Sequence, residues 1–235
     1  MSEADPVRRA REEGRTALTE PEAKRLLADA GISTPEFEVA TTVEAAVDAA
    51  SRLGFPVVVK VCSAAVTHKS EWAAGAGVAV GLDTPDAVRA AADRIFEAAA
   101  DRGIAADVLV ETAVDLDAGT EVIVGGLRDP SFGPVVLTGL GGVFTEVFED
   151  TSHRLAPLGP RAARSAIDDL RASTLLSGFR GRPAADLDAL ADVVRCVGDL
   201  VVDRDDIAEI DVNPVLATAD GAVALDALVV LEGAR

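Results

Sequence analysis

The chain is expected to adopt a mixed α+β (α/β) fold of two lobes, and three observations predict it. Its 235 residues, 49% of them hydrophobic, suffice for one large domain or two small ones. Strand-like and helix-like segments alternate over residues 19–111, as in an α/β domain. From residue 120, strand-like segments instead follow one another before two helices. We therefore expect a flexible or loosely docked arm over 1–17, an N-terminal lobe over 18–110 and a C-terminal lobe over 111–235.

Helix caps and β-branched runs define the elements expected in the first lobe. The capping box Thr19–Glu22, with proline in the first turn, begins a helix that continues over 23–30 and stops at Gly31. A second capping box, Thr41–Glu44, begins a helix that ends near Gly54, and Asp83 is expected to cap a third over 85–100. Strands are predicted over 35–40, 57–61, 78–82 and 107–111. The run 57–61 is typical of a strand buried on both faces.

Turn signals separate the strands expected in the second lobe. Strands are predicted over 120–127, 134–139, 143–148 and 154–158, with turns at Asp129-Pro130 and Gly139–Gly142. Helices follow over 160–171 and 184–202. The chain closes with strands over 207–212 and 222–231, joined through Asn213-Pro214 and a turn at Asp220-Gly221.

The charge of the chain is strongly acidic, with a net value of −18 and a pI near 4.4. Such a surface argues against nucleic-acid binding, because the phosphate backbone would repel it. Lysine occurs only at positions 24, 60 and 69. Acidic residues with so little lysine resemble proteins of salt-loving (halophilic) organisms, where salt screens the self-repulsion, although an ordinary acidic cytosolic protein fits as well. Because lysine is so scarce, those that remain are expected to have a task.

Several classes of protein are disfavoured. No run of 18 apolar residues occurs, so we expect no membrane span, and residues 1–19 contain no apolar signal region. Cys62 and Cys196 are the only cysteines, which predicts neither a disulfide framework nor a thiolate metal site. A cytoplasmic protein is expected.

A lysine and a histidine after the apolar strand 57–61 suggest phosphoryl chemistry. Lys60 would supply a compact positive charge, and His68, in the run His-Lys-Ser, could accept a phosphoryl group as a nucleophile. The glycines of Gly75-Ala76-Gly77 would let the backbone approach a phosphate. The alternative is a solvated loop histidine beside a structural lysine, with the glycines in a plain hairpin turn.

Two further sets of residues could contact a nucleotide or a partner. Glu111, at the end of a short strand, and Glu121, on the next one, could take ribose hydroxyls while the strand backbone meets a base; a sheet edge and a solvated glutamate are the alternative. The glycine run 139–142, with Glu146 and Arg154, could approach a phosphate or a partner loop, and structural turning explains it equally well.

A metal site is predicted at the C-terminal end. Two neighbouring strands joined by a turn can place Asn213 and Asp226 side by side, and such amide and carboxylate oxygens suit Mg²⁺. The alternative is a turn asparagine and a surface aspartate. Asp226, however, lies inside an apolar run, where an unpaired carboxylate would be costly.

A series of motifs in a fixed order resembles one family, the ATP-grasp β subunit of ADP-forming acetate–CoA ligases (acyl-CoA synthetases, NDP-forming). The succinyl-CoA synthetase β chain is more distantly similar. The resemblance covers about residues 17–231. The motifs are Leu-Thr-Glu-Pro-Glu-Ala-Lys (18–24), Pro-Val-Val-Val-Lys (56–60), His-Lys-Ser-Glu (68–71), Leu-Val-Glu (109–111), Gly-Thr-Glu-Val-Ile-Val-Gly (119–125), Arg-Asp-Pro-Ser-Phe-Gly-Pro (128–134), Gly-Leu-Gly-Gly-Val-Phe (139–144), Arg-Leu-Ala-Pro-Leu (154–158) and Glu-Ile-Asp-Val-Asn-Pro (209–214).

This resemblance implies an ATP-grasp fold, in which two lobes clamp Mg-ATP, and it implies a role for each motif residue. Lys60 would contact the phosphates, and the loop Gly75–Gly77 would cover them. Glu111 would lie at the adenine hinge, and Val114 belongs to the same nucleotide-binding set. The second lobe would contribute a nucleotide-site carboxylate and the Mg²⁺ ligands, which are Glu121, Asn213 and Asp226.

The resemblance also implies an enzyme, an acid–CoA ligase that couples acyl-CoA cleavage to ATP synthesis from ADP and phosphate. The reaction passes through an acyl phosphate and a phosphohistidine on a mobile loop of an α subunit, which also carries the CoA site, in an α2β2 assembly. His68 would carry a second phosphohistidine. One departure is the stretch Trp72–Gly77, which is longer and poorer in glycine than the family pattern His-Lys-Ser-Asp-x-Gly-Gly-Val.

Two alternatives stay open from the sequence. One is a non-catalytic ATP-grasp nucleotide-binding module in a regulatory assembly, and the other is a self-contained carboxylate ligase. The joint presence of Lys60, His68, Asn213 and Asp226 favours the catalytic subunit, because a decayed site would be expected to lose some of them.

Overall fold

The computed structural model describes residues 5–66, 69, 72–141, 150–179 and 183–233, and it divides into two compact units. The small unit comprises residues 19–21 and 35–114, and the large unit comprises residues 1–18, 22–34 and 115–235. The change of unit after residue 114 lies close to the expected lobe boundary. Residues 1–18 and 22–34, in contrast, group with the C-terminal part of the chain.

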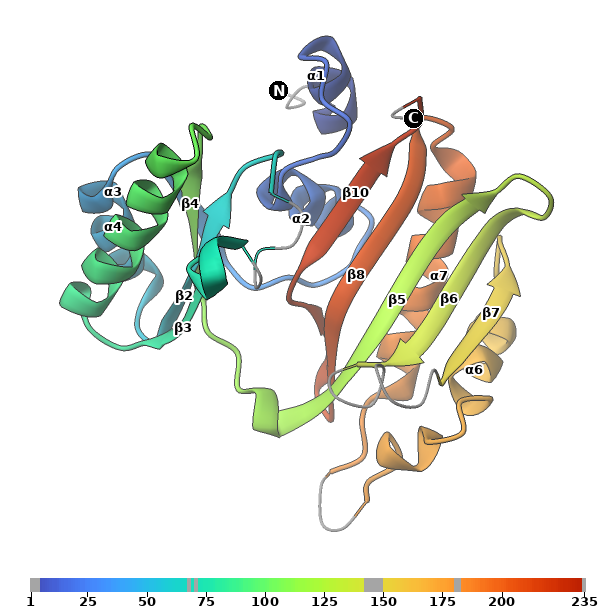
Figure 1. Ribbon diagram of the computed structural model, residues 1–235. Helices are drawn as coiled ribbons and strands as arrows, with labels where there is room; N and C mark the ends of the chain where they lie inside the picture. Colours follow the sequence, from blue (N-terminus) through green and yellow to red (C-terminus); the bar gives the residue numbers. More distant parts are fainter. Residues whose placement is uncertain (1–4, 67–68, 70–71, 142–149, 180–182, 234–235) are drawn as a thin grey trace. The chain divides into compact units, whose positions relative to one another are not determined.

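The small unit is a four-stranded sheet covered by two helices (Figure 1). The strand order is β1-β4-β2-β3, and each neighbouring pair is antiparallel. Each β–α–β crossover therefore links two parallel strands that a third strand separates, so the alternation of strands and helices produces no parallel pairing. The elements are β1 (Phe37–Ala40), α3 (Val43–Leu53), β2 (Val57–Cys62), η1 (Trp72–Gly75), β3 (Val78–Leu82), α4 (Pro85–Asp101) and β4 (Asp107–Thr112).

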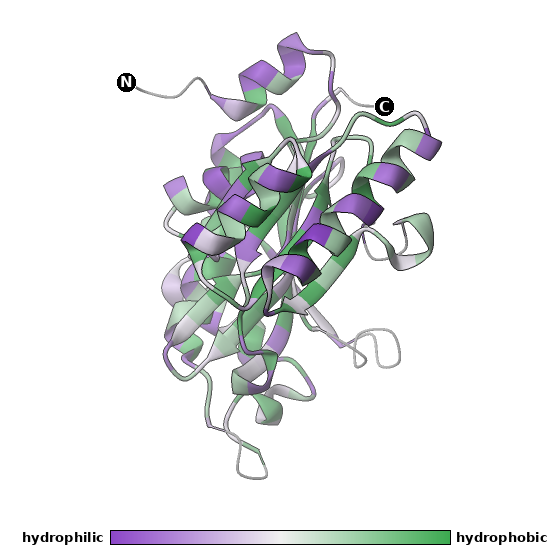
Figure 2. Cartoon of the chain, turned by 90° about the vertical axis from the view of Figure 1, so that its left-hand side faces the viewer, coloured by the Kyte–Doolittle hydropathy of each residue, from purple (hydrophilic) through white to green (hydrophobic). Residues whose placement is uncertain are grey.

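One face of this sheet forms the core of the small unit. Alternate residues of β2 and β4 point toward α3 and α4, because successive side chains of a strand face opposite sides. Figure 2 shows both hydrophilic and hydrophobic residues along the two helices, as expected for helices half facing water. The residues buried between the sheet and the helices include Val57, Val59, Val61, Val108, Val110, Ala46, Ala49, Ala50, Val88, Ala92 and Ile95.

Threonine side chains cap both helices of the small unit. Thr42 accepts the backbone N–H of Ala45 at 3.1 Å, as the capping box predicts. On α4 the cap is Thr84, which accepts from Ala87 at 3.3 Å, so the prediction of Asp83 as the cap is wrong. Pro85 fixes the first helical position one residue later than a cap at Asp83 would require.

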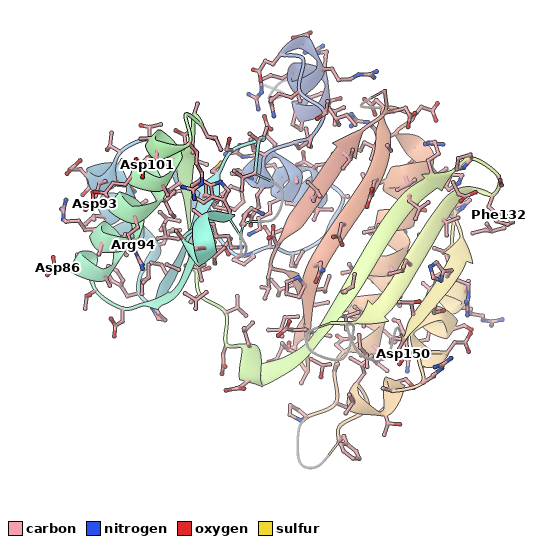
Figure 3. The ribbon with its side chains drawn as sticks, viewed as in Figure 1. Asp86, Asp93, Arg94, Asp101, Phe132 and Asp150 are labelled. Atoms are coloured by element: carbon pink, nitrogen blue, oxygen red, sulfur yellow. The ribbon has the colours of Figure 1, made fainter. Side chains whose placement is uncertain are left out.

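The outer side of α4 shows where much of the acidic charge lies. Figure 3 shows Asp86, Asp93 and Asp101 on the side of this helix that faces away from the strands, and all three are exposed. Water and salt can screen charges in such positions, so these three carboxylates place little strain on the core of the unit.

The large unit contains a six-stranded antiparallel sheet with the path β10-β8-β5-β6-β7, and β9 pairs with β8 (Figure 1). Apolar residues of α7 and α6 pack against it. The first two residues of α2 group with the small unit. The elements are α1 (Pro6–Glu12), α2 (Glu20–Asp29), η2 (Leu116–Ala118), β5 (Gly119–Asp129), β6 (Gly133–Leu140), β7 (Thr151–Leu155), α6 (Pro160–Asp168), η3 (Ser173–Leu175), α7 (Leu187–Asp203), β8 (Ile207–Thr218), β9 (Gly221–Ala224) and β10 (Ala227–Leu231).

Three strand predictions need correction, and one lies outside the described residues. The strand expected over 222–231 is divided into β9 (Gly221–Ala224) and β10 (Ala227–Leu231), which pair with different parts of β8. The strand expected over 154–158 is observed as Thr151–Leu155, since Pro157 has no N–H for the ladder. Strand β8 continues through Asn213-Pro214 instead of ending there. Proline is tolerated at that point because the pairing of β8 with β5 is irregular opposite Val122–Val124. The strand expected over 143–148 falls on residues that the structure does not describe.

The N-terminal segment is folded rather than a flexible arm over its described residues. Asp5 caps α1 by accepting the backbone N–H of Val7 at 3.0 Å, and Val7 is fully buried. Further on, the backbone of Leu18 donates to Val229 at 3.0 Å, and Leu231 donates to Thr16 at 2.9 Å. Residues 16–18 therefore extend the outer side of β10.

An arginine of the C-terminal region holds the start of this segment. Arg204, which follows α7, contacts Asp5 at 2.9 Å and Asp206 at 2.9 Å. The hydrogen bond from Arg204 lowers the pKa of the Asp206 carboxyl below its ordinary value. A charge-assisted contact thus joins the start of the N-terminal segment to the stretch after α7, in addition to the backbone hydrogen bonds with β10.

Candidate functional site

Two charged residues lie on the face of the small sheet opposite its helices. Val59 and Val61 of β2 face the helices, so Lys60 between them faces the other side. In the same way Glu111 follows Val110 of β4. Since Val58 pairs with Glu111 and Lys60 pairs with Leu109, the lysine and the glutamate are diagonal neighbours across two strands.

Lys60 is buried between two carboxylates. Its Nζ lies 2.7 Å from Oε1 of Glu111 and 2.9 Å from Oε1 of Glu20, the first residue of α2. The side chains of Lys60, Glu111 and Glu20 are only 8%, 4% and 1% exposed. Burying a charge away from water costs several kcal/mol, so ion pairing of this quality is what makes a lysine at this position tolerable.

A second lysine meets the same glutamate. Nζ of Lys69 lies 3.1 Å from Oε2 of Glu20, with 10% of the lysine side chain exposed. Glu20 thus contacts Lys60 with one carboxylate oxygen and Lys69 with the other. The third lysine, Lys24, is fully buried.

Sequence reasoning misses Glu20 as a site residue. The run Thr19–Glu22 reads as a helix cap, and Glu20 lies 40 residues before its partner Lys60. A counter-charge for the lysines could have been expected on physical grounds. A lysine inside an apolar strand needs an anionic partner, and the segment that follows this strand contains a second lysine.

The loop between β2 and β3 brings its backbone into close approach at Gly77. A Cβ added at Gly77 would lie 2.2 Å from the backbone oxygen of Lys69, so only glycine fits there. The carbonyl of Gly77 also accepts the N–H of Val61 at 2.8 Å. Gly75 has a φ of 90°, a conformation that glycine adopts without strain. The predicted glycines are therefore needed by the shape of this loop.

The departure Trp72–Gly77 has a definite structure. It forms the short η1 turn, in which Ala73 and Ala74 adopt positive φ values of 52° and 58°. Such values are strained for residues other than glycine and cluster at functional sites. The guanidinium of Arg102 lies 5.5 Å from the centre of the Trp72 ring and anchors this turn to the end of α4.

The remaining predicted residues of this region are placed less specifically. Val114 is half-buried and is the last residue of the small unit. His68 and Ser70, singled out with Lys60, lie outside the described residues.

In the large unit, Glu121 is held against the predicted glycine run. The N–H of Gly141 donates to the backbone oxygen of Glu121 at 2.7 Å, and a Cβ on Gly141 would lie 2.9 Å from Cβ of Glu121. Glycine at 141 therefore permits the close approach of the two backbones. Gly142 and Glu146 lie outside the described residues, and Arg154 forms an ion pair with Asp169.

The two predicted metal ligands are neighbours, as the strand pattern suggests. The backbone N–H of Asn213 lies 3.3 Å from the backbone oxygen of Asp226. Asp226 also accepts the N–H of Ala227 through Oδ1 at 2.8 Å, which orients its carboxylate. Within the described ranges, no group of three or more His, Cys, Asp or Glu residues could hold a metal by itself. The donor set of one amide and one carboxylate fits an ion that takes its other ligands from phosphate and water.

No helix within the portion of the chain that the structure describes is long and apolar enough to span a membrane.

Comparison with known proteins gives matches over nearly the whole chain. Residues 9–231 match the family described as the ATP-grasp domain. The chain is 40% identical over 228 residues to the acetate–CoA ligase [ADP-forming] I subunit beta of Pyrococcus furiosus, with 96% of each protein covered. It is 41% identical to the trans-feruloyl-CoA synthase FCS1 of an unknown prokaryote over 92% of this chain, but spans only 30% of that longer protein.

A solved enzyme shares the fold of the chain. Acetyl-coenzyme A synthetase 1 of Ca. Korarchaeum cryptofilum superposes with a TM-score of 0.83 at 39% identity, covering 97% of this chain and 99% of that chain. That structure is described as a complex with coenzyme A and Mg-AMPPCP, in which a phosphohistidine segment points towards the nucleotide-binding site.

Proposed function

Because this chain belongs to the ATP-grasp family and matches an ADP-forming acetate–CoA ligase β subunit almost end to end, we propose that it is the nucleotide-binding subunit of such a ligase. The reaction converts acyl-CoA, ADP and phosphate into a carboxylic acid, CoA and ATP. The observation that supports this function most directly is Lys60, a buried ammonium on the sheet face opposite the helices, with two carboxylates as its counter-ions.

Lys60 binds the phosphates of ADP in this proposal. A lysine ammonium is a compact charge that can exchange a carboxylate for a phosphate oxygen without leaving its strand. Glu111, on the neighbouring strand, gives up its contact with Lys60 when the nucleotide binds. Glu111 and Val114 lie beside the adenine base. Gly75 and Gly77 let the backbone of the loop between β2 and β3 approach the phosphates.

The large unit contributes the carboxylate of Glu121 and the ligands of Mg²⁺. Asn213 and Asp226 would hold the ion, since their backbones are hydrogen-bonded and both side chains offer oxygen donors. When bound, Mg²⁺ neutralises charge on the phosphates of the nucleotide. The Mg-nucleotide bound to the related synthetase supports this choice of metal.

His68 passes the phosphoryl group to ADP. A phosphohistidine of the partner subunit donates its phosphoryl group to an imidazole nitrogen of His68, which loses a proton as the new P–N bond forms and the old one breaks. An oxygen of the β-phosphate of ADP then attacks the phosphorus, the P–N bond breaks, and ATP leaves while the imidazole is restored. Lysine charges near the transferring group stabilise the charge that develops on it.

The assembly partner is an α subunit that binds CoA and the acid, in an α2β2 enzyme of the cytoplasm. The β-subunit name of the Pyrococcus relative supports a separate partner chain. Relatives named for acetate and for ferulate are 40% and 41% identical to this chain. This similarity supports the view that the partner subunit, rather than this chain, selects the acid.

The first experiment compares the chain alone with the chain co-purified with its candidate α subunit. We expect the chain alone to bind Mg-ADP without acyl-CoA turnover, and the complex to form ATP from acetyl-CoA or another acyl-CoA, ADP and phosphate. Titration calorimetry and a coupled ATP assay measure the two properties. ATP synthesis by the isolated chain would contradict the proposal that CoA and the acid bind to a separate subunit. A complex that forms no ATP from any of several acyl-CoAs would contradict the proposed function.

Replacement of Asp226 by alanine should weaken binding of Mg-ADP and raise the Mg²⁺ concentration required. The loss of one of two oxygen ligands is expected to reduce metal affinity about 10-fold or more, by analogy with changes near other metal sites. Titration of ADP at several Mg²⁺ concentrations measures both effects. The matched control is Asp220→Ala, which removes an exposed carboxylate from the β8–β9 turn. Equal Mg²⁺ dependence in the two variants would remove Asp226 from the metal site.

A further inference from the structure

We infer that Glu20 is a positioning residue for phosphoryl transfer, because it fixes Lys69 beside Lys60 through its two carboxylate oxygens. The inference rests on the proposed function and adds to it a residue from the start of α2. Lys69 directly follows His68 in the sequence, so Glu20 holds the residue next to the proposed phosphoryl carrier.

The geometry of the bridge is specific. Oε1 of Glu20 contacts Nζ of Lys60 at 2.9 Å, and Oε2 contacts Nζ of Lys69 at 3.1 Å. A single rigid carboxylate therefore determines how the two ammonium groups lie relative to each other. The Glu20 side chain is 1% exposed, so the surrounding protein leaves it little room to turn away.

The backbone of Lys69 is restrained from a second direction. The close approach of Gly77 to the Lys69 carbonyl, where a Cβ would lie at 2.2 Å, leaves no space between these two segments. Gly77 is in turn tied to β2 by the hydrogen bond from Val61. Lys69 is thus restrained at its backbone by the loop and at its side chain by Glu20.

The charges around Glu20 suit a residue that positions the two lysines for phosphate but does not itself bind it. With all four groups ionised, Glu20, Glu111, Lys60 and Lys69 form a neutral cluster. The carboxylate of Glu20 holds two like charges close together before substrate arrives, so a phosphate oxygen that replaces a carboxylate meets an ammonium group already in place. Preorganised cations of this kind stabilise the transferring phosphoryl group at no cost of reorganisation during the reaction.

Glu20→Gln is the direct test, because it keeps the size of the side chain and removes its charge. In the assembled enzyme we expect kcat for ATP formation to fall about 10- to 100-fold, the loss typical of a misplaced group near the reacting atoms. The KM for ADP should stay within about 3-fold of wild type, because Lys60 keeps its contact with Glu111. Glu20→Asp, which retains the charge, should recover part of kcat.

A double-mutant cycle separates positioning from general damage. Lys69→Gln should lower kcat as Glu20→Gln does, and the double variant should be no worse than either single one, since both remove the same interaction. The matched control is Glu22→Gln, a buried carboxylate on the same helix that pairs with Arg9 and Arg15. It should lower the melting temperature while kcat stays near that of wild type.

The outcomes distinguish this inference from the function on which it rests. A wild-type enzyme that forms ATP, together with Lys69→Gln or Glu20→Gln variants within about 3-fold of its kcat, would overturn the role of Glu20. Additive losses in the double variant would do the same. Lys69→Gln removes the more exposed partner, so it decides the matter even if Glu20→Gln does not fold. A wild-type complex without ATP formation would count against the proposed function instead.

Discussion

Replacement of His68 by alanine should abolish ATP formation by the assembled enzyme and leave ADP binding unchanged. In the proposed mechanism the variant loses the nitrogen that accepts the phosphoryl group. Removal of a catalytic nucleophile costs other enzymes about 10³-fold or more in kcat, and we expect a loss of that size here. Phosphorylation of the partner subunit from acyl-CoA and phosphate should persist, because it precedes transfer to His68.

Single-turnover labelling with radioactive phosphate measures both halves of this prediction, comparing label on the partner subunit with label in ATP. The chain supplies its own control, since His153 is its only other histidine and is exposed on β7. His153→Ala should form ATP like wild type. Normal ATP formation by the His68 variant would return His68 to an ordinary loop histidine.

Replacement of Lys60 by methionine should both destabilise the protein and prevent binding of ADP. Methionine fills much of the lysine volume but leaves Glu20 and Glu111 facing each other without the cation between them. Breaking a buried ion pair by removing one partner costs about 3–5 kcal/mol, and the phosphates of ADP lose their main charge contact as well. Urea unfolding gives the first quantity and titration calorimetry the second.

An exposed ion pair on the small unit provides the matched control for the Lys60 variant. Arg52 pairs with Glu38 at 2.6 Å, but the arginine side chain is 59% exposed. The hydrogen bond from Arg52 lowers the pKa of the Glu38 carboxyl, yet water screens an exposed pair of this kind, so it contributes little to stability. Arg52→Met should therefore unfold close to wild type and bind ADP normally. Similar stabilities for the Lys60 and Arg52 variants would show that the buried cluster is not the strong contact we infer.

Local patterns made most of the elements predictable. The β-branched run before Lys60 becomes β2, and the Thr42 cap begins α3 as expected. The ordered motifs predicted the ATP-grasp fold and the ligase family, and both are confirmed by the family match and by the Pyrococcus β subunit. The roles of Lys60, Asn213, Asp226 and the other site residues stay predictions, as does the halophilic origin.

Other features depend on contacts between distant parts of the chain. A β–α–β sequence does not reveal whether a third strand will enter between its two strands, so the antiparallel order of the small sheet was not predictable from alternation. Glu20 is uninformative until the structure places it beside Lys60, 40 residues later in the chain. The docking of residues 5–18 likewise depends on β10, more than 200 residues later, and their polar composition gave no local sign of it.

The pairing of residues 16–18 with β10 also bears on how the protein behaves in solution. An uncovered edge strand presents a row of unsatisfied N–H and C=O groups, and such rows recruit strands from other molecules. β10 reads Ala-Leu-Val-Val-Leu, an apolar segment without charge or proline and therefore of the kind that assembles into intermolecular sheets. Residues 16–18 satisfy part of that row and so reduce the tendency of β10 to pair with other molecules. Expression tags and deletions at the N-terminus should therefore leave Thr16–Leu18 intact.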